Sequence, residues 1–388
     1  MSQLGDGIFT VALALEALDL THRPSGFALV IAARMIPTIL LALVSGVVVD
    51  RVSRQAAMLV SDVVRGASVT TIALLTATGH IRLWELVVMS AIFGIADSFF
   101  NPASYAVMPE LLEADFLVRG NALNSTSSQM AVGFLGPAVG GSIVGAVGTA
   151  WAFGMDAASF AVSAFCLALM RRRPRPVSEP STFLEDAREG IRYVKSERWL
   201  WLTLIAAGIA NLTGLAPLGV LVPLLVRETL HSSPFGLGMI FAAGGLGGVV
   251  ASLIVARLGS PKRMVVVMWS AYGAAVVPIC AMALSRTIWL VGLCVVVEVG
   301  LIVYGDVLFF AMLQQLVPQK LLGRVSSVLY LMAVGLMPLG TLLAGILATV
   351  MGIRVTLFLS AVITSVTTFI LLFPDVRDPE VLRTSPAE

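Results

Sequence analysis

The sequence predicts an all-α protein built from membrane-spanning helices. Of its 388 residues, 58% are hydrophobic and only 12% are charged, and the mean hydropathy is +0.95. A soluble domain is roughly half apolar and about a quarter charged. The apolar residues also form long runs, each close to the ~20 residues that a helix needs to cross a bilayer. These two observations favour a polytopic membrane protein.

Twelve apolar runs, separated by charged or Gly- and Pro-rich breaks, are expected to form the spanning helices. They cover 3–20, 25–48, 56–78, 83–107, 121–147, 150–170, 199–222, 235–256, 264–284, 288–313, 325–349 and 353–373. The first run is short for a crossing and carries Asp6 and Glu16. We expect either that this helix starts about ten residues upstream of Met1 or that it is short and tilted.

The distribution of basic residues predicts the orientation. Placing Asp50–Arg54 in the cytoplasm gives that side Arg51, Arg54, Arg119, Arg171, Arg172, Arg173, Arg175, Arg188, Arg192, Lys195, Arg198, Arg257, Lys262, Arg263, Lys320, Arg324, Arg377 and Arg383. The opposite loops hold only Arg23, Arg82, Arg227, Arg286 and Arg354. The positive-inside rule then places both termini in the cytoplasm of a bacterium, with the chain in its plasma membrane.

Several classes of function have no support in the sequence. Cys166, Cys280 and Cys294 lie in apolar runs and imply no disulfide framework. No phosphate-binding Gly-rich motif, nucleophile elbow or cluster of metal-ligating side chains is found, so we expect no enzyme, no cofactor and no metal site. We expect the lipid bilayer and a small molecule as partners, no nucleic acid, and a monomer.

A basic, Pro-containing stretch at 171–198 divides the chain. Its second part places Phe183, Leu184, Ala187, Ile191 and Val194 on one helical face, which predicts an amphipathic helix on the cytoplasmic surface. The predicted organisation is a six-helix bundle at 1–170, this linker at 171–198, a second six-helix bundle at 199–373 and a cytoplasmic tail at 374–388.

The two bundles are expected to be repeats of each other. A shift of 209 residues places Asp97 on Asp306, Phe100 on Phe309, Pro109 on Pro318, Leu112 on Leu321 and Arg54 on Arg263. Parallel six-helix repeats related by an axis along the membrane normal are typical of a transporter architecture, in which the substrate site lies between the halves.

Motifs in the first half resemble those of the major facilitator superfamily. The run Gly46–Arg54, with Asp50, Arg51 and Arg54, is similar to its loop 2–3 signature, and Gly136–Gly141 is similar to the Gly-Pro-x-x-Gly-Gly signature of its exporters. The stretches Gly5-Asp6, Ser61–Arg65, Asn101-Pro102-Ala103, Pro109-Glu110 and Asp156–Phe160 resemble the bacterial branch that contains enterobactin exporters and macrolide-efflux proteins. This resemblance covers nearly the whole chain and implies the twelve-helix major facilitator fold.

The sequence departs from the family in two places. The run 83–107 has no arginine, whereas many proton-coupled drug exporters of the superfamily carry one in this helix. The repeat counterpart of the signature loop keeps Lys262 and Arg263 but has Gly259 where Asp50 stands in the first half. The signature loop is therefore expected to act in the first half only.

Charged side chains inside apolar runs are the main candidates for function, because each is costly without a partner or a wet cavity. Glu298 is the deepest carboxylate and the first candidate for proton coupling. The other candidates for a central cavity are Asp306, Asp97, Asp6, Asn101 and Asn211. The alternatives are a protonated helix contact for Glu298 and local capping or gating for Asp97 and Asp306.

Three further groups have predicted structural roles. Gly46, Asp50, Arg51, Arg54, Asp62, Arg65 and Arg119 are expected to form a cytoplasmic gate that joins the halves. Arg34 cannot readily lose its charge, so an intramembrane ion pair with Glu16 or Asp156 is expected. Small residues let helices approach closely, and prolines can bend them, which is the expected role of Gly136, Pro137, Gly140, Gly141 and Pro338.

The sequence thus predicts a secondary transporter that exports a hydrophobic or amphipathic small molecule by alternating access, driven by the proton gradient. The alternatives are a facilitator or importer of a polar nutrient and, from another class, a non-transporting membrane receptor or scaffold. A receptor or scaffold should lack a charge-lined path through the helices.

Overall fold

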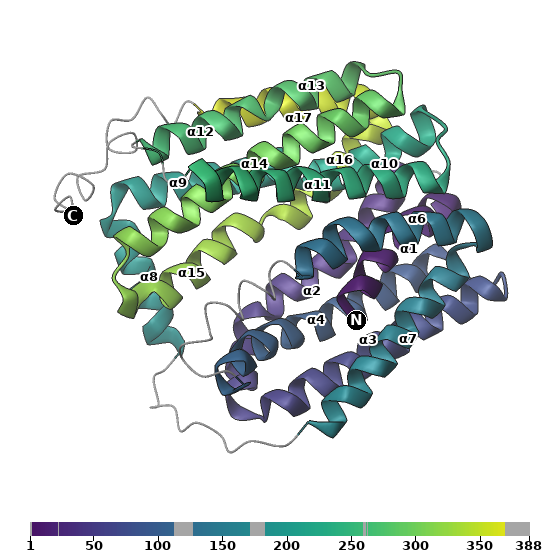
Figure 1. Ribbon diagram of the computed structural model, residues 1–388, viewed down its shortest axis with the longest axis horizontal. Coiled ribbons are helices and arrows are strands. Elements are labelled where there is room, and N and C mark those ends of the chain that lie inside the picture. Colours follow the sequence, from purple (N-terminus) through teal and green to yellow (C-terminus); the bar gives the residue numbers. More distant parts are fainter. Residues whose placement is uncertain are drawn as a thin grey trace.

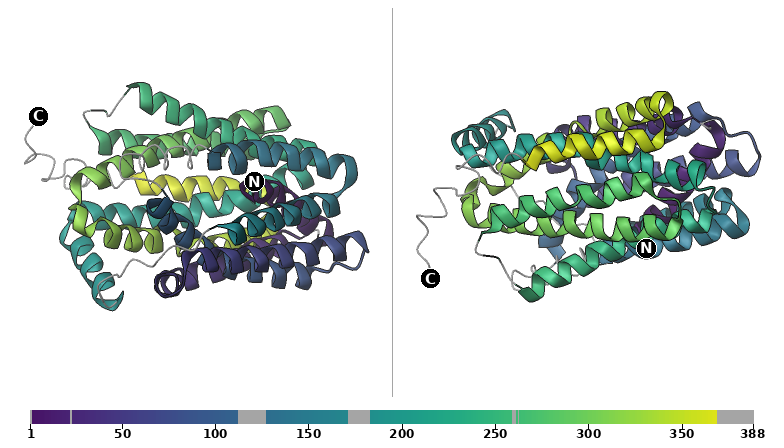
Figure 2. Two further views of the ribbon diagram at one scale, coloured as in Figure 1. Left: turned by 60° about the horizontal axis from the view of Figure 1, so that its bottom comes forward. Right: turned by 90° about the horizontal axis from the view of Figure 1, so that it is seen from above.

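A computed structural model describes residues 2–21, 23–111, 127–170, 183–258, 261 and 263–368. These residues form helices that run alongside one another, and no strand occurs among them (Figures 1 and 2). In Figure 1 the helices of the first half, in purple and blue, lie together, and those of the second half, in green and yellow, lie beside them.

Every one of the predicted runs has a helical counterpart in the described residues. The first half holds α1 (Ser2–Thr21), α2 (Pro24–Arg51), α3 (Arg54–Ala77), α4 (Leu83–Leu111), the π-helical η1 (Gln129–Leu135), α6 (Gly136–Val147) and α7 (Thr149–Leu169). The elements that follow are α8 (Phe183–Ser196), α9 (Arg198–Ala210), η2 (Asn211–Leu215), α10 (Ala216–Leu224), η3 (Leu225–Thr229), α11 (Pro234–Leu258), α12 (Met264–Ala274), α13 (Val276–Leu284), α14 (Ile288–Leu316), α15 (Gln319–Val334), α16 (Met337–Met351) and α17 (Ile353–Val366).

The predicted all-α membrane fold is confirmed. Ten helical stretches of the described chain are long and apolar enough to cross a membrane. The two remaining runs are α1, which carries three acidic residues, and the 14-residue α17. The division into two bundles, a linker and a tail stays a prediction, since 171–182 and 369–388 lie outside the described residues. Within the predicted linker, α8 packs against α9 and α15 and buries Gly190 and Val194.

Three spanning segments are interrupted just before a proline. Pro137 and Pro217 lie in the first turn of α6 and α10, and each follows a π-helical stretch. Proline lacks an N–H and clashes with the carbonyl four residues earlier, so the preceding turn widens. The amide of Gly136 accordingly bonds to the carbonyl of Ala131, five residues earlier. Pro338 opens α16, and the helix is broken before it.

Glycines bring α1, α6 and α11 into backbone contact. On one face of α6, a Cβ at Gly136 would stand 2.7 Å from the Cα of Gly7 in α1. On another face, a Cβ at Gly141 would stand 2.8 Å from the Cα of Gly238 in α11. Neither distance leaves room for a side chain. The helix α6 therefore lies between α1 of the first half and α11 of the second at the separation that only glycine permits.

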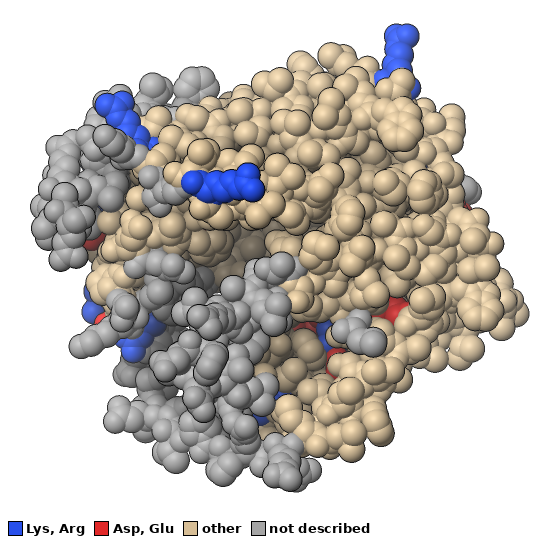
Figure 3. Space-filling model, viewed as in Figure 1, with Lys and Arg blue, Asp and Glu red and all other residues tan. Residues whose placement is uncertain are grey.

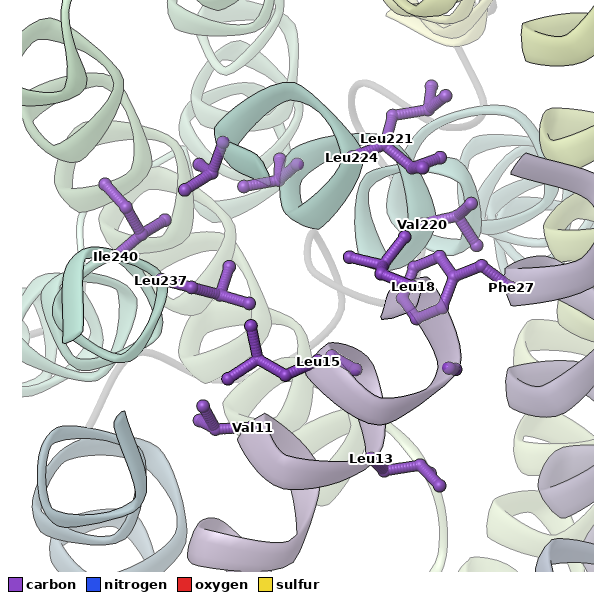
Figure 4. Packing of buried hydrophobic residues seen from close by; sticks show 14 of the residues in the cluster. Val11, Leu13, Leu15, Leu18, Phe27, Val220, Leu221, Leu224, Leu237 and Ile240 are labelled. Atoms are coloured by element: carbon purple, nitrogen blue, oxygen red, sulfur yellow. The ribbon is translucent and has the colours of Figure 1, made fainter. Parts of the chain in front are cut away.

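Apolar side chains close one end of the interface between the halves. Figure 4 shows side chains of α1, α2, α10 and α11 that point toward one another. They are at most 3% exposed and include Leu15, Leu18, Phe27, Val220, Leu221, Leu224, Leu237 and Ile240. An ion pair between Asp19 and Arg227, with 3.4 Å between Oδ1 and Nη2, joins the halves at the same end. Burial of this many large side chains makes closure of this end stable.

Away from this closed end, the buried clusters belong to one half each. One joins Met58, Ala103 and Val107 of the first half, and another runs from Val194 to Val325 in the second. Among the described residues, the face in Figure 3 is made mostly of uncharged ones, with a recess in the middle of the view and a few acidic and basic atoms near it. The halves are therefore sealed together at the end of the molecule where the chain turns from α1 into α2.

The close contact of α6 and α11 gives a first prediction. Gly238→Ala should destabilise the protein by about 1–3 kcal/mol, because its Cβ would meet the Gly141 backbone. The matched control is Gly154→Ala on α7, where a Cβ meets nothing within 4 Å. Thermal unfolding in detergent compares the two. Equal unfolding midpoints for both variants would show that the contact is not tight.

Candidate functional site

A cavity of about 290 Å³ lies inside the second half of the chain. Its walls come from α9, η2, α10, α12, α13, α14, α15 and the end of α17, and none of the described residues before Thr203 contributes. Most of the lining is apolar or aromatic, including Leu204, Leu215, Leu218, Ile279, Ile302, Phe309, Phe310, Leu329 and Val334. Its size is near the lower end of the range for small-molecule sites.

Two carboxylates line this cavity, and no Lys, Arg or His among the described residues does. Glu298 of α14 is 4% exposed, and its Oε1 has no hydrogen-bond partner among the residues that the structure describes. Asp306, two turns further along α14, accepts a hydrogen bond of 2.7 Å from the hydroxyl of Tyr272. The cavity thus combines apolar walls with acidic groups that have no cationic partner among its lining residues.

Among the described residues, three buried polar groups of the cavity lining have no hydrogen-bond partner. Besides Glu298 Oε1, they are Thr203 Oγ1 and Trp269 Nε1. Buried polar groups are almost always hydrogen-bonded, so each exception needs an explanation. Together they supply a carboxylate acceptor, an indole donor and a hydroxyl to one enclosed space, which is the arrangement of a site that binds a molecule from outside the chain.

Asn211 of η2 also lines the cavity and fixes its shape. Its Nδ2 donates a hydrogen bond of 2.9 Å to the carbonyl of Ala333, at the end of α15. This bond joins the π-helical turn of one segment to the place where another segment is broken before Pro338. The two irregular stretches therefore lie side by side in the wall of the cavity.

A network of ion pairs lies inside the first half. Arg65 of α3 binds Asp97 of α4, with 3.0 Å between Nη1 and Oδ1, and also pairs with Asp62. Arg34 of α2 binds the other oxygen of Asp97 at 3.2 Å, and the hydroxyl of Ser163 donates to Asp62 at 2.6 Å. Asp62 and Arg65 are 0% and 2% exposed. Two guanidinium groups and two carboxylates thus neutralise each other.

Aromatic rings surround both arginines of this network. The guanidinium carbon of Arg65 lies 3.9 Å from the ring centroid of Phe100 and 4.8 Å from that of Phe160. The guanidinium carbon of Arg34 lies 4.6 Å from the ring centroid of Phe93. Contacts of a cation with ring faces are favourable when water is excluded. The arginines are therefore held by rings as well as by carboxylates.

The remaining buried or partly buried acids of the spanning helices in the first half have no arginine as hydrogen-bond partner among the described residues. Asp156 of α7 is 0% exposed, and its Oδ1 accepts a hydrogen bond of 3.2 Å from Ser159. Asp156 Oδ2 and Asp6 Oδ1 are buried without a partner. Glu16 accepts a hydrogen bond from Thr149. These groups are satisfied only in part by the protein.

The structure corrects the predicted ion pair of Arg34. Its carboxylate is Asp97, whereas Glu16 and Asp156 bind the hydroxyls of Thr149 and Ser159. The position of a charged residue in an apolar run indicates its depth in the membrane, but it does not indicate toward which neighbouring helix the side chain points.

The structure also divides the predicted cavity residues. Glu298, Asp306 and Asn211 line the cavity, but Asp97, Asp6 and Asn101 do not. Asp97 instead binds two arginines, and Asn101 is exposed on α4. The equivalence of Asp97 with Asp306 in the repeat therefore does not extend to their environments.

The predicted cytoplasmic gate is only partly described. The ion pairs of Asp62 and Arg65 lie within the first half and do not join it to the second. The surroundings of Gly46, the side chains of Asp50 and Arg51, and all of Arg119 lie outside what the structure describes. At Arg54 the chain enters α3, and Ser53 caps that helix by accepting a 3.2 Å hydrogen bond from Ala56. The role of this group stays a prediction.

Sequence reasoning missed the aromatic and hydroxyl groups of the cavity. Thr203, Trp269 and Tyr272 lie in apolar runs, where they resemble ordinary core residues. The only sequence signal was the separation of Trp269 and Tyr272 by three positions, which places them on one face of a helix. Their rings meet edge to face, with centroids 5.5 Å apart.

Comparison with known proteins identifies the family. Residues 1–388 match the model of a family described as Transmembrane secretion effector, within the major facilitator superfamily. This chain belongs to that family. It is a multi-span membrane transporter for small molecules, and the predicted family and class of function are confirmed.

Relatives and solved structures agree with this assignment. The chain is 27% identical over 374 residues to the multidrug efflux pump Tap of Mycobacterium tuberculosis, which covers 92% of this chain and 86% of Tap. It is 26% identical over 357 residues to an MFS-type transporter of Sinorhizobium fredii, covering 90% and 86%. A bacterial homologue of the iron transporter ferroportin, in an inward-facing state, shares the fold with a TM-score of 0.74 at 14% identity, covering 96% and 95%. The nucleoside transporter NupG also gives 0.74, at 11% identity and 96% of both chains.

The ion-pair network gives a second prediction. Asp97→Asn should lower the free energy of unfolding by about 3 kcal/mol, because it leaves the Arg34 guanidinium without its carboxylate inside the helix bundle. Asp19→Asn, a change of the same kind at an exposed acid, is the control and should cost less than about 1 kcal/mol. Chemical unfolding in detergent measures both. An effect of Asp97→Asn no larger than that of the control would contradict the shared ion pair.

Proposed function

We propose that this transporter exports an amphipathic small molecule that carries positive charge, in exchange for protons. The observation that supports this most directly is the cavity of the second half, where apolar walls surround Glu298 and Asp306 without any basic side chain among the described residues. The name of the relative Tap, a multidrug efflux pump, supports the direction of transport.

Each part of the cavity suits one part of such a molecule. The leucine, isoleucine and phenylalanine side chains bind its apolar body, and removing that body from water supplies most of the affinity. Trp269 and Tyr272 offer ring faces and edges to a cation. The free Oε1 of Glu298 accepts the positive group or a hydrogen bond from it.

The same carboxylate offers a means of coupling to protons. A negative charge that is 96% removed from solvent is costly, so Glu298 must bind either a proton or a cation. Binding of the cationic substrate then releases the proton, and protonation releases the substrate. Because the two ligands compete for one group, a proton gradient can drive substrate in the opposite direction.

The end at which the two halves are sealed indicates on which side of the membrane this conformation is closed. Leu15, Leu18 and Leu221 belong to the seal between the halves, near the turn between α1 and α2. The excess of basic residues on the opposite side supports a cytoplasmic location for that side and for both termini, in a bacterial plasma membrane. The state described is then closed to the outside.

Transport in inverted vesicles tests the proposed function. Ethidium, a fluorescent amphipathic cation, should accumulate in vesicles that contain the protein, and accumulation should stop when the proton gradient is collapsed. A panel of neutral apolar compounds and polar nutrients should not accumulate. Gradient-independent accumulation would remove the antiport mechanism, and transport of polar nutrients alone would replace export of an amphipathic cation with the alternative function.

Glu298→Gln gives a third prediction. It should weaken ethidium binding at least about tenfold, because it removes a buried charge–charge interaction, and should abolish the dependence of transport on the proton gradient. Asp306→Asn is the matched variant in the same cavity, and should affect binding less because the hydrogen bond to Tyr272 already occupies that carboxylate. Proton coupling that persists in Glu298→Gln would move the role to another acid.

A further inference from the structure

Two acids in the first half, the partly buried Asp6 and the buried Asp156, take no part in the cavity described above. The helices that carry them, α1 and α7, pack against each other. The carboxylate of Asp156 and the hydroxyl of Ser159 lie directly on the backbone of Gly5, where an added Cβ would collide with both. Asp156 therefore reaches α1 at the residue that precedes Asp6, and the absence of a side chain at Gly5 makes that approach possible.

The arginines of the first half are already neutralised by other carboxylates. Arg34 and Arg65 lie near Asp6 and Asp156, and Asp62 and Asp97 bind these arginines, so the two positive and two negative charges cancel. Arg34 and Arg65 both bind Asp97, and Arg65 binds Asp62 as well. No hydrogen bond or ion pair between either arginine and Asp6 or Asp156 is found in the described chain.

The other elements packed on α1 supply no countercharge. The sequences of η1 and α6 contain no Asp, Glu, Lys, Arg or His, and α11 carries only Arg257, in its last turn. From α7 the only charged residue is Asp156 itself. The two acids thus remain an uncompensated group inside the first half.

One carboxylate oxygen of Asp156 and one of Asp6 are buried without a hydrogen-bond partner among the described residues, which indicates that these groups bind a small ligand. Asp156 is 0% exposed and its Oδ2 has no partner, and the buried Oδ1 of Asp6 has none either. Neighbouring carboxylates with buried oxygens do not readily both stay ionised without a cation, because burial and mutual repulsion favour the neutral form. Two carboxylates are also fewer than the ligands of a metal site, and no group of three or more potential ligands occurs among the described residues.

We propose that Asp6 and Asp156 form a proton-binding site in the first half, separate from the substrate cavity in the second. The two acids share one proton in the state described, and loss of that proton leaves adjacent charges that α1 and α7 can relieve only by moving apart.

Close helix contacts connect this site to the interface of the halves. Gly7, the residue after Asp6, meets Gly136 of α6 backbone to backbone, and α6 in turn meets α11 at Gly141 and Gly238. A displacement of α1 cannot be absorbed by side chains along this path, because glycines have none. Proton exchange at Asp6 and Asp156 therefore acts on the same α6–α11 contact that joins the halves.

The contact path continues to the cavity. Gly247 of α11 lies against the carbonyl of Val296 on α14, two residues before Glu298. The proton site and the substrate site are thus connected through α1, α6, α11 and α14. A role of the proton site in coupling rests on the proposed export function, whereas the binding of the proton itself does not.

Infrared spectroscopy of the full-length protein tests the proton directly. In the purified variant Glu298→Gln with Asp306→Asn, which removes both acids of the cavity, a C=O band of a protonated carboxylic acid should remain at neutral pH. The further double substitution Asp6→Asn and Asp156→Asn should abolish it, while Asp19→Asn on the same helix should not. Asparagine is close to a neutral aspartic acid in shape, and an unchanged unfolding temperature confirms that each variant folds. A band that survives the double substitution would overturn the proposal.

Transport then separates this proposal from the proposed function. With Glu298 intact, the double variant should exchange ethidium across vesicle membranes at equal pH as the parent does, but should lose accumulation driven by a proton gradient. Gradient-driven accumulation equal to that of the parent would overturn a coupling role for the pair. If the unmodified protein does not transport ethidium while the infrared band behaves as expected, the substrate assignment fails and the proton site stands.

Discussion

The cost of charge in a low-dielectric interior is the constraint on which the arrangement of this transporter depends. Its two halves meet that cost in different ways. The first half pairs Arg34 and Arg65 with Asp62 and Asp97 and encloses them in aromatic rings. The second half leaves Glu298 beside an apolar cavity without a basic partner among the lining residues. The arginines of the first half are therefore compensated by carboxylates of the same half, whereas Glu298 of the second half needs an external ligand.

Backbone contact between helices joins these two environments. Where α6 lies between α1 and α11, glycines remove the layer of side chains that would otherwise separate the helices. At the closed end, large apolar side chains from both halves form a single cluster. The interface therefore has a rigid part, in which backbones touch, and an apolar seal beside it. Neither part contains a buried charge in the described residues, so separating the halves there exposes no unpaired ion.

Much of the fold could be predicted from the sequence, because hydropathy records where a chain must be covered by lipid or protein. The twelve runs, the helix within the linker and the depth of Glu298 followed from this. The pairing of Arg34 with Asp97 did not, since it depends on the rotation of each helix about its axis. The sequence places Asp97 and Asp306 at equivalent positions, yet one binds two arginines and the other a tyrosine hydroxyl. The cavity itself arises from packing between several helices, which no single run records.

The π-helical turn at Asn211–Leu215 has a consequence for how this segment is built. A turn with one additional residue shifts the phase of all later residues by about 100° around the helix axis. In a regular α-helix Asn211 and Leu218, seven residues apart, would lie about 20° from each other, so the additional residue turns them apart and widens the arc of this segment that lines the cavity. Loss of one residue from Asn211–Leu215 would restore a regular α-helix and turn one part of the segment relative to the other. Substitutions that keep the length of this stretch leave the same residues in the cavity wall. Deletion of one residue would instead turn different residues toward the cavity.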